Sequence, residues 1–153
     1  MRPYLLFLSL LWFLVACSLT ANQEKSLNRA IIQYQNAYNK ELTILEVSLT
    51  HPCVIDAHLS DTGKLKKLFI HPGSSIENYD IEEIDKDGAD MKVKLTFDYL
   101  NGQAELKDSK KTIYALSSNR GESWFFLSAS HVKYLNCKRF KNKHCSICGL
   151  PLN

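Results

Sequence analysis

The chain has 153 residues, of which 45% are hydrophobic and 23% are charged, and its formal net charge at pH 7 is +3. This length suits a single domain with a real core, and the absence of internal repeats and of long linkers excludes a repeat array or several joined domains. The net charge is too small to indicate nucleic acid as a partner.

The N-terminal residues have the pattern of an export signal. Arg2 supplies one positive charge, and residues 5–16 follow as an apolar run in which Ser9 is the only polar residue. The pattern predicts a secretory signal peptide over residues 1–16. The run is too short for a transmembrane helix, which needs about 20 apolar residues. A buried N-terminal helix and a signal peptide cleaved at another site are the alternatives.

Cys17 ends the run Leu14-Val15-Ala16-Cys17 directly after this apolar segment. The run resembles the lipobox of bacterial lipoproteins, in which a signal peptidase cuts before the cysteine and its sulfur receives a diacylglycerol. The resemblance implies a mature chain of residues 17–153 anchored to a membrane through Cys17. Because Ser18 follows instead of aspartate, the sorting rule of enteric-type bacteria implies the periplasmic side of the outer membrane.

The residues after the anchor predict a tether and then a long helix. Residues 17–25, which are mostly polar from residue 20 onward, are expected to form a lipidated tether, and the folded domain is expected to span residues 26–132. Apolar residues recur at helical spacing from Leu27 to Leu45 and predict an amphipathic helix of about five turns. A possible start is marked by Thr20 and Gln23, which have capping-box spacing.

Two further segments precede the first predicted strand. Residues 44–49 alternate between apolar and polar side chains, so the long helix could give way to a strand there. Residues 61–70 predict a short second helix, capped by Ser60 or Asp61 and ended by the run His71-Pro72-Gly73.

The rest of the domain has strand patterns separated by turns. Residues 91–99 alternate most clearly, between apolar residues and residues such as lysine and threonine. Asp87-Gly88 and Asn101-Gly102 are typical of tight hairpin turns. The other predicted strands are residues 76–84, 103–106, 112–117 and 123–130.

Helices followed by an antiparallel meander predict an α+β fold, with the amphipathic helix and the short second helix packed on a curved sheet. This order, the two turns and the closing run Gly121-Glu122-Ser123-Trp124-Phe125-Phe126 are similar to the cone-shaped nuclear-transport-factor-2-like superfamily. The resemblance spans about residues 24–131 and implies a pocket inside the cone. It carries over no catalytic residue and implies no particular activity.

Residues 133–153 are predicted to form a basic, cysteine-rich tail without periodicity. Once Cys17 is set aside as the lipid site, an even number of cysteines remains, and thiols in an oxidising compartment most often pair. Sequence alone does not choose among the three possible pairings. A zinc site and a redox pair are the alternatives. The disulfide candidates are Cys53, Cys137, Cys145 and Cys148; the zinc ligands would be Cys137, His144, Cys145 and Cys148; the redox pair would be Cys145 and Cys148.

No pattern in the chain predicts a catalytic residue or a cofactor. The acidic run at residues 85–90 lacks the ligand spacing of a calcium loop, and the five histidines are scattered. We therefore expect a non-catalytic, lipid-anchored envelope domain that binds a ligand or an envelope protein. The alternatives are a pocket enzyme, such as an isomerase, dehydratase or hydrolase, and a structural envelope component. A pocket with a converging carboxylate or histidine would favour the enzyme, and a filled cone with an exposed aromatic patch would favour the binding domain. An apolar surface near Trp124 that pairs with itself would support the structural component.

Overall fold

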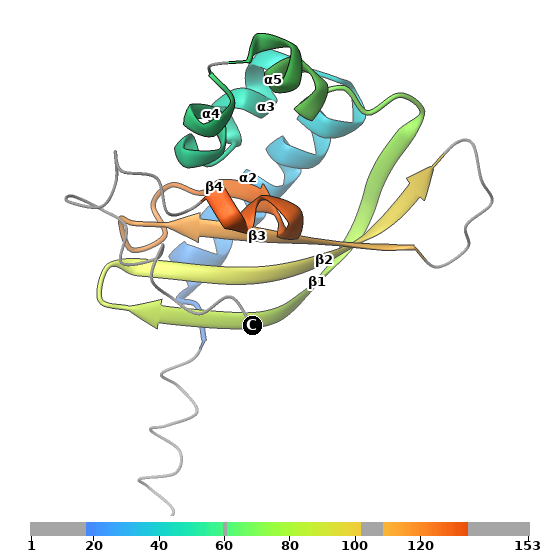
Figure 1. Ribbon diagram of the computed structural model, residues 1–153. Helices are drawn as coiled ribbons and strands as arrows, with labels where there is room; N and C mark the ends of the chain where they lie inside the picture. The colour runs from blue at the N-terminus through green and yellow to red at the C-terminus, as the bar shows by residue number, and fades with distance from the viewer. Residues whose placement is uncertain (1–17, 60, 102–108, 135–153) are drawn as a thin grey trace, which may run out of the picture.

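The computed structural model describes residues 18–59, 61–101 and 109–134. Within these residues, four helices precede four strands and a short 3-10 helix, which confirms the predicted α+β class, and the order can be followed in Figure 1. The helices are α2 (Ala21–Asn39), α3 (Thr43–Leu49), α4 (Pro52–His58) and α5 (Thr62–Leu68). The later elements are β1 (Ser74–Asp87), β2 (Asp90–Asn101), β3 (Lys110–Ser117), β4 (Phe125–Ser128) and η1 (Ala129–Tyr134).

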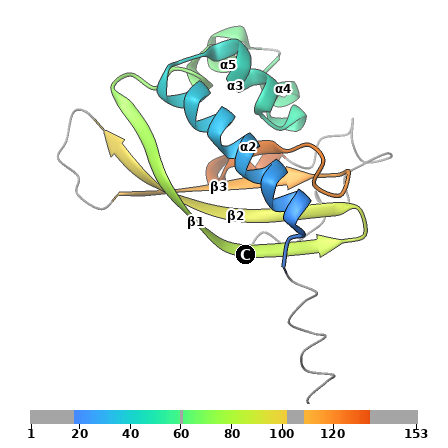
Figure 2. The ribbon, with the colours of Figure 1, turned by 180° about the vertical axis from the view of Figure 1, so that it is seen from behind.

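The strands form one antiparallel sheet in the order β1-β2-β3-β4, which is the predicted meander. The pairs Val93↔Ala115 and Ala115↔Phe126 set the register of the last three strands, so their apolar residues share one face. Two irregularities interrupt the pairing of β1 with β2, between Glu77 and Tyr79 and between Ile81 and Glu83. Such irregularities bend a strand, and Figures 1 and 2 show that β1 is strongly curved.

The helix α2 crosses one face of this sheet diagonally, as Figure 2 shows. Its buried side chains recur at helical spacing and pack on the apolar face of the strands. Leu27 and Ile31 are completely buried, and burial of such a side chain stabilises a fold by roughly 2 kcal/mol. The main core consists of Leu27, Ala30, Ile31, Tyr34, Tyr38, Ile76, Met91, Val93, Leu95, Phe97, Ile113, Ala115, Trp124 and Phe126.

The start of α2 lies inside the segment that was predicted as a tether. Thr20 caps the helix, because its hydroxyl accepts a hydrogen bond from the Gln23 amide and the Gln23 side chain accepts one from the Thr20 amide. This reciprocal pair confirms the predicted capping box. The helix therefore begins at Ala21, five residues before the predicted domain boundary.

Residues 44–49 lie in the helix α3, which decides between the helix and the strand that the sequence left open there. The alternation does not match the buried side chains, because Glu46 and Thr50 face inward while Ile44 is exposed. The helix α4 was not predicted at all, and it starts at Pro52, where proline suits the first helical position. The predicted cap of α5 is confirmed, because the Asp61 carboxylate accepts a hydrogen bond from the Lys64 amide.

The first predicted hairpin turn is also confirmed. Asp87 pairs with Asp90 across the turn between β1 and β2, and Gly88 adopts a φ of 60°, which glycine tolerates best. The strand predicted at residues 103–106 lies outside the described residues, and so does Gly102 of the predicted Asn101-Gly102 turn.

Candidate functional site

A cavity of about 500 Å³ lies at the C-terminal end of α2. Its walls come from α2, α3 and α5 on one side and from β3, β4 and η1 on the other. Aromatic and aliphatic side chains line it together with several ionisable groups. The ionisable side chains of the lining are Tyr34, Tyr38, Glu46, Lys67, His71, Lys110, Lys111 and His131.

Glu46 brings a carboxylate into this cavity from α3. It is only 3% exposed, and its Oε1 atom lies 2.9 Å from Nε2 of His71, in the loop before β1. Its other oxygen, Oε2, is buried and accepts no hydrogen bond from the residues that the structure describes. An unsatisfied buried acceptor costs about 1–3 kcal/mol, and more when it is charged. The cavity therefore contains an acceptor that a bound donor would satisfy.

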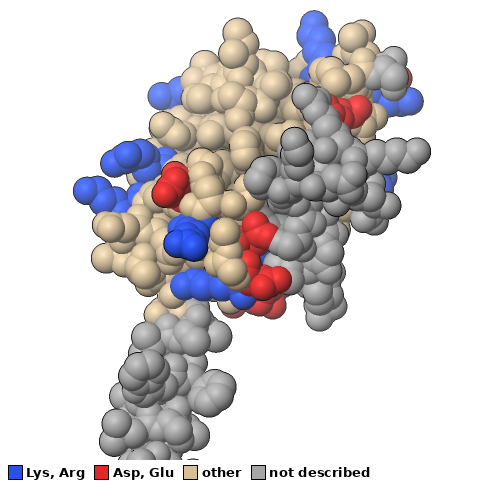
Figure 3. Space-filling view, turned by 90° about the vertical axis from the view of Figure 1, so that its left-hand side faces the viewer, with Lys and Arg blue, Asp and Glu red and all other residues tan. Residues whose placement is uncertain are grey.

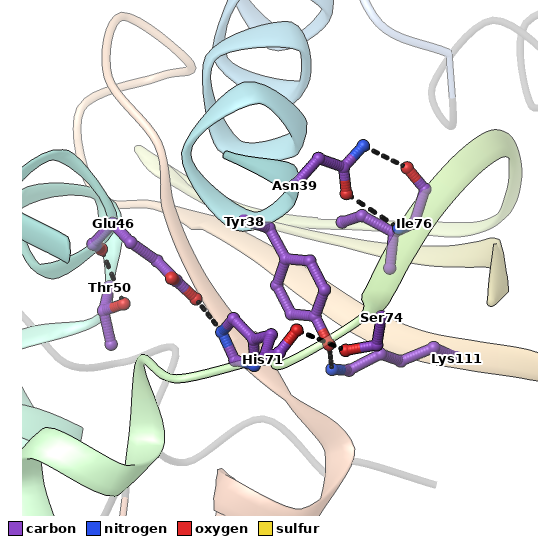
Figure 4. Close-up of polar contacts among 8 residues, drawn as sticks. All are labelled: Tyr38, Asn39, Glu46, Thr50, His71, Ser74, Ile76 and Lys111. Atoms are coloured by element: carbon purple, nitrogen blue, oxygen red, sulfur yellow. Dashed lines mark hydrogen bonds and ion pairs between the residues drawn. The ribbon is translucent and has the colours of Figure 1, made fainter. Parts of the chain in front are cut away.

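Tyr38 and Lys111 continue this set of contacts, as Figure 4 shows. The rings of Tyr38 and His71 are stacked, with 3.8 Å between their centroids. The Lys111 ammonium donates a hydrogen bond of 2.8 Å to the Tyr38 hydroxyl and lies 4.3 Å from the centre of that ring. Burial lowers the pKa of Lys111, although the charge of Glu46 opposes the shift. Burial also raises the pKa of Tyr38 to about 12, so its hydroxyl stays protonated at neutral pH.

Lys111 has no carboxylate within ion-pair distance among the described side chains, whereas its neighbour Lys110 is paired with Asp98. Glu46 and Lys111 do not pair with each other either, because His71 and Tyr38 stand between them. The cavity thus holds a carboxylate and an ammonium that do not pair with each other.

Backbone contacts hold this arrangement in place. The Asn39 side chain makes two hydrogen bonds of 2.8 Å to the backbone of Ile76, which fasten the end of α2 to the start of β1 (Figure 4). The His71 carbonyl accepts hydrogen bonds from both the amide and the hydroxyl of Ser74. The Thr50 hydroxyl donates to the Glu46 carbonyl at the end of α3. Each side chain of the site is therefore attached to a fixed element.

The apolar wall of the cavity is aromatic. Tyr34 stacks on Phe126, with ring centroids 4.6 Å apart, and links α2 to β4. Burial raises the pKa of the Tyr34 hydroxyl far above its usual range, so this group is neutral at any physiological pH. His131 lines the opposite side, where burial is the main cause of a lowered pKa and the charges of His58, Lys111 and Lys133 add to it.

Most residues singled out from the sequence lie outside the described part of the chain. These are Cys17, Cys137, His144, Cys145 and Cys148. Lipidation, disulfide pairing and the zinc alternative therefore stay predictions. Cys53 lies on α4 and is completely buried. Within the described residues, no group of three or more histidine, cysteine, aspartate or glutamate side chains could hold a metal ion.

Trp124 and Phe126 belong to the main core, and Trp124 is only 4% exposed. Phe125 points to the other face, where its ring contacts His51 edge-on. The indole of Trp124 therefore does not form an exposed aromatic patch.

The acidic residues of β1 lie opposite lysines of β2. Asp85 pairs with Lys92 at 2.6 Å, and Glu82 pairs with Lys94 at 2.8 Å. On the lower part of the face shown in Figure 3, basic and acidic side chains are accordingly interspersed. The acidic stretch of the sequence thus does not build a surface of one sign there.

Sequence reasoning missed the cavity residues because they are far apart in the chain. Glu46, His71 and Lys111 come from a helix, a loop and a strand, and no spacing rule connects them. One signal was present: Glu46 is the only charged residue in the otherwise mostly apolar segment of α3. An acid of this kind is normally assigned to the surface, so it draws attention to α3 without predicting that Glu46 is buried.

Comparison with protein families, with curated proteins and with solved structures finds no match to this chain. Among the described residues, no helix combines the length and the hydrophobicity that crossing a membrane requires.

Proposed function

We propose that this chain is a lipid-anchored domain of the bacterial envelope that holds a small ligand in the cavity at the end of α2. The observation that carries the ligand-binding role is Oε2 of Glu46, a buried acceptor that has no donor among the described residues and belongs to a side chain lining a cavity of about 500 Å³. Ligand sites have this form: a concave, largely apolar surface with a few polar groups that fix orientation.

The lipid anchor rests on the sequence around Cys17. Mass spectrometry of the intact protein, extracted from membranes without reductant, tests it. We expect a chain that starts at Cys17 and carries the added mass of acyl chains. The Cys17→Ser variant should then extract into aqueous buffer, and a variant that still partitions into detergent would contradict the anchor. Two disulfides among the remaining four cysteines would lower the same mass by four hydrogens.

A fragment screen by NMR tests the ligand-binding role. The labelled mature protein, in detergent micelles, would be titrated with a general set of small polar and aromatic compounds. We expect the amide shifts caused by binders to cluster around Thr50, Thr112 and Ser128, which line the cavity. Binders that cluster elsewhere, or a complete absence of binders, would contradict the proposal.

A pocket enzyme is the second candidate, and the contact between Glu46 and His71 favours it. A carboxylate that holds one imidazole nitrogen fixes the ring and leaves the other nitrogen, Nδ1, to exchange a proton with a substrate. Such a pair would catalyse exchange of an acidic C–H of a bound compound with deuterated water. Exchange that is lost in His71→Gln, while binding is kept, would identify an enzyme. Binding without exchange would leave the non-catalytic role.

A further inference from the structure

The cavity places two opposite charges at separate points. Oε2 of the Glu46 carboxylate has no hydrogen-bond donor among the described residues. Within the same part of the chain, the Lys111 ammonium donates to the Tyr38 hydroxyl and lies near the rings of Tyr38 and Tyr99. A ligand that contacts both groups must carry an acceptor for Lys111, preferably an anion, and a hydrogen-bond donor for Oε2 of Glu46.

The rest of the lining also favours an anion. Glu46 is the only acidic residue of the lining, whereas Lys67, Lys110 and Lys111 are basic. Asp98 pairs with Lys110, but it does not line the cavity. The stacked rings of Tyr34 and Phe126 give the body of the ligand an apolar surface.

We propose that the cavity binds a small organic acid that carries a hydroxyl or amino group near its anionic end. The anion would lie at Lys111, the donor at Oε2 of Glu46, and the apolar part of the molecule against Tyr34 and Phe126. This assignment rests on the ligand-binding role proposed above and adds the chemical class of the ligand.

Mandelate is a suitable probe, because it combines a carboxylate, a hydroxyl and a phenyl ring. Phenylacetate lacks the hydroxyl, 1-phenyl-1,2-ethanediol lacks the carboxylate, and phenylglycine replaces the hydroxyl with an amine. Dissociation constants would be measured by NMR titration of the mature protein, with the amide shifts reporting where each compound binds. We expect mandelate or phenylglycine to bind about tenfold more tightly than either incomplete analogue.

Two variants assign the contacts. In Lys111→Met, mandelate should bind no better than the diol, since the partner of the carboxylate is gone. In Glu46→Gln, the advantage of mandelate over phenylacetate should fall, since the acceptor loses its charge. Lys94→Met is the matched control, because this lysine pairs with Glu82, does not line the cavity and should leave the ranking unchanged. Circular dichroism would establish that each variant is folded.

The ranking in the unaltered protein decides the proposal whether or not the variants fold. Equal affinities for mandelate, phenylacetate and the diol at the cavity would overturn the ligand class and leave the binding role intact. Failure of every compound in the fragment screen to reach the cavity would overturn both.

Discussion

His51 should make the stability of the fold depend on pH. It precedes α4 and is only 7% exposed, and its Nδ1 atom accepts a hydrogen bond from the Cys53 amide. Burial lowers the pKa of His51 from 6.5 to about 4. Protonation of Nδ1 would also remove this capping contact. The folded protein therefore keeps the imidazole neutral under conditions in which the unfolded chain takes up a proton.

The sign of the effect follows from which state binds more protons. Between pH 6.5 and about pH 4 the unfolded chain is protonated at His51 and the folded chain is not, so acid favours unfolding. Above pH 6.5 both states are neutral and the full stability is present. For these pKa values, lowering the pH from 7 to 5 should reduce the free energy of unfolding by about 2 kcal/mol through this residue alone.

Urea unfolding of the Cys17→Ser chain at pH 7 and pH 5 measures this difference. In the His51→Asn variant the side chain can still cap the helix but does not titrate, so most of the loss between the two pH values should disappear. His131→Asn is the control, because the pKa of His131 is also lowered and its removal should leave the part due to His51. Equal losses in the parent chain and in His51→Asn would refute the reasoning.

Four further substitutions test two turns and the two ends of α2, each by thermal unfolding followed with circular dichroism. Gly88→Ala should cost about 1–2 kcal/mol, because Gly88 has a φ of 60° in open space. Gly121→Ala should cost about 1–3 kcal/mol more than Gly88→Ala, because its added Cβ would lie 3.0–3.2 Å from three side chains. Equal losses at the two glycines would contradict the crowding. Thr20→Ala should cost about 1 kcal/mol by loss of the cap. Asn39→Ala should cost about 2 kcal/mol, because two hydrogen bonds to Ile76 are lost, and an unchanged melting temperature would show that they contribute nothing.

The sheet and the long helix could be predicted because their determinants are local. The alternation through residues 91–99, the glycine at the first turn and the capping pair of Thr20 and Gln23 each involve neighbours in the chain. The apolar residues of α2 recur on one face and those of β2 alternate, so their period identifies both elements even though both faces of β2 are largely covered. The register of β1 and β2 beside their connection then follows from the tight turn at Gly88.

The helices α3 and α4 could not be predicted in the same way, since the side chains that they bury include polar ones and do not recur at a clear apolar spacing. Glu46 would normally be assigned to the surface, yet it is buried because His71 meets it from a loop 25 residues later. The same long-range contact creates the candidate site. A site assembled from a helix, a loop and a strand leaves no spacing pattern in the sequence, so only the folded structure brings its parts together.

The position of the cavity also bears on the proposed anchor. With lipid on Cys17, at most about 14 Å of chain would separate it from the first residue of α2. From Ala21 to Tyr38 the helix rises about 26 Å, and Tyr38 lies at the cavity. The anchor and the cavity would thus belong to opposite ends of α2, and Figure 1 places the helices α3 to α5 at the end far from the start of α2. A short tether would hold the domain at the bilayer, and the long helix would set the ligand site apart from the anchored end.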